Sequence, residues 1–269
     1  MAETAIYDRL ISEVFRRHYR PELTEFLLER EEMETILREW GERVKNLGDV
    51  TYSYRGGRRL LPDEIRQTGQ WVIEGRGRGK YAFRRLSRNP DITLPPDLRA
   101  IGILDATPDV ILKYGSGDEQ GLLTRVRYNR LIDTFLGVTA YHLQSHCRAY
   151  VTNSGQVEID DLYLGVDTNG RQYVIPVEGK TVDEPMGVVQ IVNMIAYAKQ
   201  TFPDLALRPV AIKAWSDQSL FFVEFNDAVD ANDIAVHEYR RYILIRDPHL
   251  TRSWSVSPKI RSGEDDIEP

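Results

Sequence analysis

The chain has 269 residues, a formal net charge of −6, and 42% hydrophobic and 28% charged residues, which is typical of a well-packed globular protein of one or two domains. Its single cysteine, Cys147, excludes an internal disulfide and any metal site built from several cysteines. The N-terminal residues mix acidic and basic side chains, and no stretch approaches the ~20 consecutive apolar residues that span a membrane. We therefore expect a cytoplasmic protein with no membrane partner.

The net charge conceals an uneven distribution of charged residues. Between Val50 and Pro90 there are ten Arg or Lys and three acidic residues, a balance of +7, so the rest of the chain carries −6 − 7 = −13. A basic segment on an acidic protein is the distribution expected when one face contacts phosphates. A solvated, arginine-rich loop would produce the same distribution, so charge alone leaves both interpretations open.

Residues 5 to about 47 carry apolar side chains at helical spacing and predict two helices, separated at Pro21 and closed by Gly48. Two basic segments with extended character follow, over residues 50–59 and 70–86. In the second, apolar residues alternate with polar ones on either side of a cationic, glycine-rich tip at residues 75–80, which predicts a β-hairpin.

Helices followed by a basic hairpin resemble a winged-helix DNA-binding domain, in which the hairpin is the wing. This resemblance implies that basic side chains contact the phosphate backbone or enter a groove. Tyr52, Tyr54, Tyr81 and Phe83 are candidates for base stacking, although packing inside the wing is the favoured interpretation. The candidate DNA-binding residues are Arg55, Arg58, Arg59, Arg76, Arg78 and Lys80.

Residues 87–100 are polar and contain three prolines, so we place a domain boundary there. The pattern then predicts a helix over about 118–136, strands over 141–151, 157–166 and 172–181, a helix over 188–202, and strands over 208–216 and 219–226. This order is typical of a mixed α/β core. The predicted organisation is a smaller α+β winged-helix-like domain (1–90), an α/β domain (95–255) and a disordered acidic tail (256–269).

One predicted hairpin brings acidic residues together. Side chains two apart on a strand share a face, so Glu178 and Lys180 project together. A three-residue loop over 168–170, with Gly170 in the left-handed conformation, would set Asp160 directly opposite Glu178. A two-residue loop would place Asp161 there instead. We favour the three-residue loop, because a glycine in its last position suits a type I turn with a bulge.

Two carboxylates and a lysine at this position suggest a metal site. Adjacent carboxylates repel each other unless a divalent cation lies between them, and ligands that are all oxygen suit Mg²⁺, for which Mn²⁺ can substitute. The predicted metal ligands are Asp160 and Glu178, with Lys180 orienting the attacking water and stabilising charge on the phosphorane oxygens. A surface ion pair on an exposed sheet edge is the disfavoured alternative, because the flanking segments have the composition of buried strands.

These residues resemble the motif of the PD-(D/E)XK nuclease superfamily, which includes many type II restriction endonucleases. The resemblance covers residues 118–225 and rests on Asp160, then Glu178 and Lys180. It implies a restriction-endonuclease-like αβββαβ core with a mixed central sheet and Mg²⁺-dependent cleavage of DNA, with Gln190 and Glu119 as supporting catalytic residues. The sequence departs from the motif at Ile159, where the superfamily's name has proline, and at the unusually small Gly179.

The resemblance leads us to expect a sequence-specific type II restriction endonuclease that hydrolyses double-stranded DNA. A homodimer is expected, since two-fold symmetry is the simplest way to cut both strands of a palindromic site. A methyltransferase acting on the same site is a possible further partner. The alternatives are a structure-specific repair nuclease or resolvase, which cuts according to DNA shape, and a non-catalytic DNA-binding regulator built on a nuclease fold.

Overall fold

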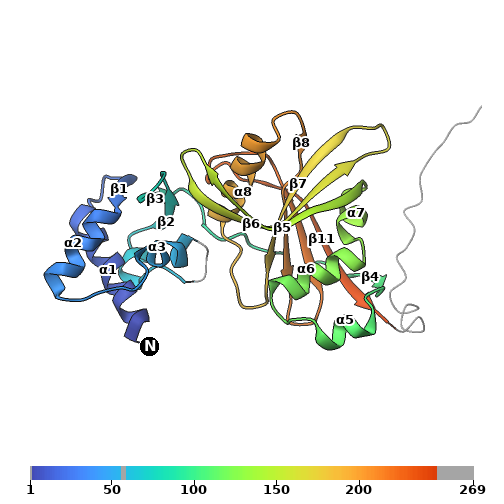
Figure 1. Ribbon diagram of the computed structural model, residues 1–269, viewed down its shortest axis with the longest axis horizontal. Helices are drawn as coiled ribbons and strands as arrows, with labels where there is room; N and C mark the ends of the chain where they lie inside the picture. Colours follow the sequence, from blue (N-terminus) through green and yellow to red (C-terminus); the bar gives the residue numbers. More distant parts are fainter. Residues whose placement is uncertain (1, 56–58, 247–269) are drawn as a thin grey trace, which may run out of the picture.

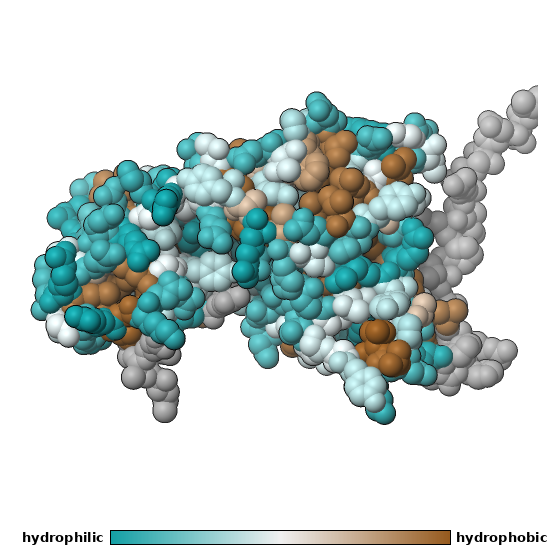
Figure 2. Space-filling model, in the orientation of Figure 1, coloured by the Kyte–Doolittle hydropathy of each residue, from teal (hydrophilic) through white to brown (hydrophobic). Residues whose placement is uncertain are grey.

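The computed structural model describes residues 2–55 and 59–246, with side chains from Ile6 onward (Figure 1). Arg58 and the predicted acidic tail at 256–269 lie outside the described residues. Within them the protein is mixed α/β, as predicted, and contains no helix that is long and apolar enough to cross a bilayer. The face seen in Figure 2 is largely hydrophilic, with smaller apolar groups at the surface, one of them beside α5 (Asp109–Tyr114).

The first part of the chain packs helices against a small antiparallel sheet. The strand order is β1-β3-β2, and an aromatic cluster that includes Phe15, Phe26, Trp71 and Phe83 fills the space beneath it. The predicted hairpin is present as β2 and β3, with its tip at residues 76–79. The elements here are α1 (Ala2–His18), β1 (Glu25–Glu29), α2 (Arg30–Trp40), α3 (Leu47–Arg55), α4 (Asp63–Arg66), β2 (Gln70–Gly75) and β3 (Lys80–Leu86).

Three local predictions in this region were wrong. Phe26 and Leu27 belong to strand β1 and not to a helix, because β1 pairs with β3 over its whole length. The helical block ends at Gly41, whose φ of 67° closes α2 with a left-handed cap, and Gly48 lies inside α3. The segment predicted as extended over 50–59 is helical up to Arg55, because Val50, Thr51 and Tyr54 form one buried helical face.

The rest of the chain forms a mixed sheet of eight strands within the described residues (Figure 1). The order is β4-β11-β10-β9-β7-β6-β5, with the short β8 also pairing with β7. Strands β8 and β9 run parallel to β7, β4 runs parallel to β11, and the other pairs are antiparallel. The strands are β4 (Ile101–Leu104), β5 (Thr139–Val151), β6 (Gly155–Val166), β7 (Gln172–Lys180), β8 (Ala206–Leu207), β9 (Val210–Ala214), β10 (Leu220–Phe225) and β11 (Val236–Ile245).

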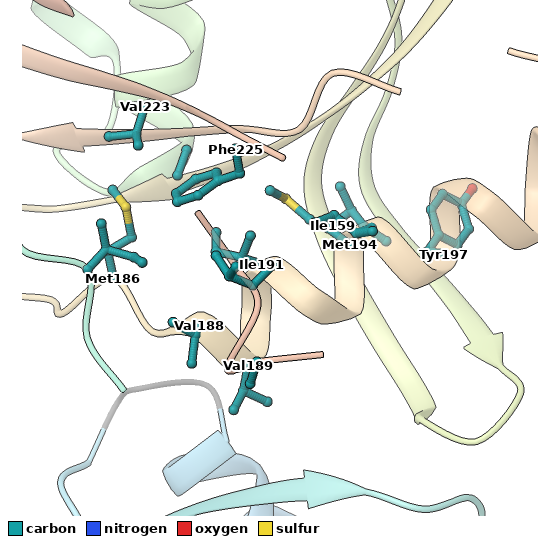
Figure 3. Packing of buried hydrophobic residues seen from close by; sticks show 14 of the residues in the cluster. Ile159, Met186, Val188, Val189, Ile191, Met194, Tyr197, Val223 and Phe225 are labelled. Carbon is teal, nitrogen blue, oxygen red and sulfur yellow. The ribbon is translucent and has the colours of Figure 1, made fainter. Parts of the chain in front are cut away.

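Helices cover both faces of this sheet. On one face, the buried side of α8 (Val188–Thr201) packs Ile191, Met194 and Ile195 against Ile159 and other sheet residues (Figure 3). On the other face lie α6 (Glu119–Tyr128) and α7 (Leu131–Leu136). Successive side chains along a strand therefore point alternately into the two cores on either side of the sheet. Polar side chains at the strand ends lie between the helices that cover the two faces. The predicted order of helix, three strands, helix and strand is present over residues 119–214.

The single helix predicted over 118–136 is instead two helices. The break lies at Asn129 and Arg130, whose φ of 48° is left-handed. The Asn129 side chain bonds the backbone N–H of Ala106 and the hydroxyl of Thr107, and this tertiary network stops the helix at that point. Strands β4 and β11 and helix α5 were also missing from the prediction, and Tyr242 of β11 adds to the core on the α6–α7 face.

Candidate active site

The hairpin between β6 and β7 sets the register of the candidate site. Asp167 and Arg171 face each other across residues 168–170, with the N–H of Asp167 donating to the carbonyl oxygen of Arg171 at 3.1 Å. Gly170 has a φ of 80°, so the predicted three-residue loop with a left-handed glycine is confirmed. The ladder runs from Val166 opposite Gln172 to Asp161 opposite Val177, and its next step brings Asp160 beside Glu178.

The two adjacent aspartates lie on opposite faces of β6. One Asp160 carboxylate oxygen accepts the backbone N–H of Gly179 at 2.9 Å, so Asp160 lies against the end of β7 beside Glu178. Asp161 is fully buried on the other face and takes no part in this cluster. Its carboxylate contacts the four side chains of Arg127, His142, Ser145 and Tyr163 at 2.7 to 3.2 Å. The aspartate facing Glu178 is therefore Asp160.

Four elements bring together the five residues predicted to be catalytic. Lys180, at the end of β7, lies 2.8 Å from Glu178 and 3.0 Å from Glu119, which begins α6. Gln190, in the first turn of α8, donates a hydrogen bond from Nε2 to the same Glu178 oxygen that contacts Lys180. Asp160, Glu178 and Lys180 are each less than 10% exposed. The cluster is not an ion pair on an exposed sheet edge.

Burial dominates the electrostatics of the cluster. Burial raises the pKa of Asp160 to about 8, reinforced by the negative charges of Glu178 and Glu119. Burial also raises the pKa of Glu178, although Lys180 partly opposes this. Burial by itself would lower the pKa of Lys180, but the carboxylates of Glu178 and Glu119 outweigh it and the pKa is raised. Lys180 therefore remains protonated, while burial favours the neutral forms of Asp160 and Glu178.

The residues present fit a cation that keeps much of its own water. Among the described residues no group of three or more His, Cys, Asp or Glu side chains forms a metal cage. Mg²⁺, however, is commonly held by one or two carboxylates together with waters and substrate phosphates, and Asp160 and Glu178 can supply those two. The buried Oε1 of Gln190 has no hydrogen-bond partner in the described part of the chain. A metal-bound water would satisfy this acceptor.

A cavity of about 770 Å³ opens in front of this cluster. The large sheet, with the first turns of α6 and α8, supplies one wall, which holds the acidic cluster with Lys180 and Gln190, and also Glu158 on β6. The first part of the chain supplies the other wall, from α3 and the tip of the β2–β3 hairpin. Basic side chains on both walls include Arg30, Arg55, Arg78 and Arg148.

The residues predicted to bind DNA lie in different environments. Arg55 is half-buried and donates to the backbone oxygen of Ser154 at 3.3 Å, while its guanidinium lies over the Tyr81 ring. Arg59 pairs with Asp8, and Arg76 pairs with Glu25 and Glu74. Arg78 and Lys80 are exposed at the hairpin tip, and Arg78 lines the cavity. Arg58 lies outside the described residues.

Sequence reasoning missed Lys213 on β9, which organises the loop after the candidate site. The Lys213 ammonium donates to the backbone oxygens of Thr181 and Val182 at 2.9 Å each, and to that of Glu184. Lys213 is opposite Lys180 in the parallel pairing of β7 and β9. The signal in the sequence was a lysine inside the apolar segment VAIKAW, which by itself does not indicate a partner.

Comparison of the chain with models of known protein families, with curated proteins and with solved structures found no match in any of the three. The nuclease superfamily therefore stays a prediction from the residues of the motif. The chemistry of the cluster and the cavity in front of it are the features of the molecule that bear on its function.

Proposed function

We propose that this protein is a Mg²⁺-dependent endonuclease that hydrolyses phosphodiester bonds in double-stranded DNA. The observation that carries the proposal is the buried cluster of Asp160, Glu178 and Lys180 at the end of a hairpin, facing a cavity whose lining includes both acidic and basic side chains. A lysine that only balanced two buried acids would not need an accessible cavity in front of it. Metal-assisted hydrolysis of a phosphodiester uses both the acids, as metal ligands, and the lysine ammonium.

Each side chain has a definite role in the proposed reaction. When bound between Asp160 and Glu178, Mg²⁺ would neutralise phosphate charge and lower the pKa of a coordinated water. Lys180 donates hydrogen bonds to the attacking water and to the phosphorane oxygens as negative charge develops on them. Glu119 holds the Lys180 ammonium in place, and Gln190 fixes the orientation of the Glu178 carboxylate. The backbone N–H of Gly179 orients Asp160.

The proposal includes sequence specificity and a dimer of the type II restriction class. Basic residues of the first part of the chain, with Arg78 and Lys80 at the hairpin tip, would contact the DNA backbone. In this proposal the first part acts as the winged-helix-like reader and the large sheet as the PD-(D/E)XK core. A cognate methyltransferase would protect the same site in the host.

The first test is cleavage of bacteriophage and plasmid DNA at low salt, with Mg²⁺ or with EDTA. We expect discrete fragments with the wild-type protein and Mg²⁺, and at least ~10²-fold slower cleavage by Glu178→Gln, because a metal ligand is lost. Asp204→Asn, which neutralises an exposed carboxylate away from the cavity, is the matched control and should cut normally. Intact DNA with both wild type and Glu178→Gln would contradict the proposal and favour a DNA-binding regulator.

A structure-specific nuclease is the second candidate, and the position of the cavity between two walls favours it. Such an enzyme would recognise distorted or unpaired DNA and not a base sequence. Fragment patterns separate the two: a restriction enzyme yields the same discrete bands from every preparation of one DNA, whereas a structure-specific enzyme nicks branched or mismatched duplexes at the distortion.

A further inference from the structure

The tip of the β2–β3 hairpin lies against the turn between β5 and β6. Gly75 approaches this turn so closely that an added Cβ would lie 1.8 Å from the backbone oxygen of Ser154. Gly155 approaches the backbone oxygen of Gly77 in the same way, at 3.1 Å from its ideal Cβ. Figure 1 shows the two hairpins side by side. The predicted wing therefore packs against the catalytic sheet instead of standing free in solvent.

Contacts also bridge the two walls beside the cluster. The Tyr52 hydroxyl donates to Glu158 at 3.3 Å, and Arg55 donates to the Ser154 carbonyl at the same distance. This solvent-open cavity has a volume of about 770 Å³, which lies in the range of pockets that hold one small organic ligand. The major groove of a DNA duplex alone is ~12 Å wide, so a whole duplex needs far more room than this cavity offers.

The cavity walls carry the two chemical features that bind a single nucleotide. Tyr52, Tyr81 and Tyr150 present aromatic rings, and Tyr150 is 58% exposed with its hydroxyl near Gly77. Arg55 and Arg78 contribute positive charge. Aromatic rings stack on bases and guanidinium groups bind phosphates, whatever the base sequence.

We propose that the cavity receives one unpaired nucleotide of the DNA, next to the phosphate that is cut. The inference rests on the proposed function, because it assumes that a phosphodiester reaches Asp160, Glu178 and Lys180. The nucleotide stacks on the tyrosine rings while its phosphate faces Lys180. It can be extruded from a paired duplex, or it can already be unpaired at a bulge or flap, and both sources present the same chemistry.

The test measures binding in EDTA, so that it does not depend on catalysis. The probes are fluorescein-labelled 30-base-pair duplexes of mixed sequence: fully paired, with one central mismatch, with one unpaired central nucleotide, and with an abasic residue in place of that nucleotide. We expect the unpaired nucleotide to tighten binding at least tenfold over the fully paired and abasic probes, because its base stacks on the tyrosine rings. A mismatch that also tightens binding identifies extrusion as the source, whereas a mismatch without effect identifies nucleotides that are already unpaired.

Variants of Tyr150 separate stacking from general attraction to DNA. Tyr150→Ala should remove the preference for the unpaired nucleotide, and Tyr150→Phe should retain it, because the ring and not the hydroxyl stacks. Tyr141→Ala is the matched control, since Tyr141 lies on the same strand, is 61% exposed and does not line the cavity. Equal affinity for all four probes, or a preference that survives in Tyr150→Ala, would overturn the inference. Cleavage that fails while the preference persists would overturn the nuclease function alone.

Discussion

Asp160 and Asp161 are neighbours in sequence with opposite environments. Asp161 is fully buried and its charge is compensated by Arg127 and by hydrogen bonds from Ser145 and Tyr163. Asp160 has one backbone hydrogen bond and lies beside other acids, so its anion is poorly compensated. One aspartate therefore stabilises the fold, while the charged form of the other destabilises it in the absence of a neighbouring cation. The same substitution should have opposite effects at the two positions.

At Asp160 we predict that the metal-free protein becomes less stable as pH rises. Its pKa is about 8 in the folded state and ~4 in the unfolded chain, so the folded state binds the extra proton between these values. The free energy of unfolding should therefore fall as pH rises from 5 to 8, then level off. Asp160→Asn should flatten this dependence and raise the melting temperature at pH 8 by ~2–4 °C, measured in EDTA. A variant less stable than wild type at pH 8 would contradict this account.

At Asp161 we predict the reverse pattern. Asp161→Asn leaves Arg127 without its buried counter-charge and weakens the bond from Ser145, so the free energy of unfolding should fall by roughly 2–4 kcal/mol. DNA cleavage at a temperature where the variant stays folded should remain within a few-fold of wild type, because Asp161 does not face Glu178. Urea unfolding and a plasmid assay measure the two quantities. Loss of DNA cleavage in the folded variant would mean that Asp161 takes part in the proposed catalytic cluster.

At the scale of elements, two hairpins build the site. The β6–β7 hairpin sets Asp160 beside Glu178, and its register follows from the loop that ends in Gly170. The β2–β3 hairpin forms part of one cavity wall and packs its tip on the β5–β6 turn, which requires a residue without Cβ at Gly75. Local turn chemistry determines the register of the β6–β7 hairpin. The position of the β2–β3 hairpin depends on contact between distant parts of the chain.

We predict that Gly75→Ala separates the β2–β3 hairpin from the β5–β6 turn. The added methyl group cannot coexist with the Ser154 carbonyl at its present position, so backbone must move, and the free energy of unfolding should fall by roughly 1–3 kcal/mol. Gly117→Ala is the matched control, because its Cβ would meet nothing within 4 Å among the described residues. Thermal unfolding compares the two variants. Equal melting temperatures of the two variants would mean that the β2–β3 hairpin does not contact the β5–β6 turn at Gly75.

At the scale of the whole molecule, polar contacts join the first part of the chain to the large sheet. Arg84 of β3 bonds both oxygens of Asp230 at 2.6 and 2.7 Å, and Ser87 donates from its N–H and its hydroxyl to Asn232. Val72 and Leu86 belong to the same buried cluster as α8. Residues 87–100, where we predicted a domain boundary, bury Ile92 and Leu94 in that cluster as well. The basic segment and the acidic site are thereby held face to face across the cavity.

We predict that the Arg84–Asp230 pair secures this arrangement. Arg84→Ala should expose residues 87–100 to limited proteolysis and lower DNA cleavage several-fold, because the cavity wall loses its fixed position. The charge-swapped double variant Arg84→Asp with Asp230→Arg should recover part of the resistance. Mass spectrometry of the fragments and a double-mutant cycle give the coupling between the two residues. No coupling between them would show that the ion pair is not what holds the two parts together.

Local rules in the sequence determined the central part of the candidate site. Strand alternation placed Glu178 and Lys180 on one face, and the turn ending in Gly170 set the register that brings Asp160 beside them. These features depend on backbone geometry over a few residues, which a sequence displays directly. The resemblance to the nuclease motif also identified Glu119 and Gln190, which contact the cluster. Their hydrogen-bond partners became visible only in the structure.

Tertiary contacts decided the rest. Strand β1 exists because β3 offers it a partner, and the helix over 118–136 breaks because Asn129 bonds Ala106 and Thr107. Both outcomes override local propensity through contacts between residues far apart in sequence. The cavity depends on the same kind of contact, since its two walls come from segments about 100 residues apart, such as Tyr52 and Glu158. A sequence motif identifies the side chains that can react. Only packing between distant segments determines which molecules can reach those side chains.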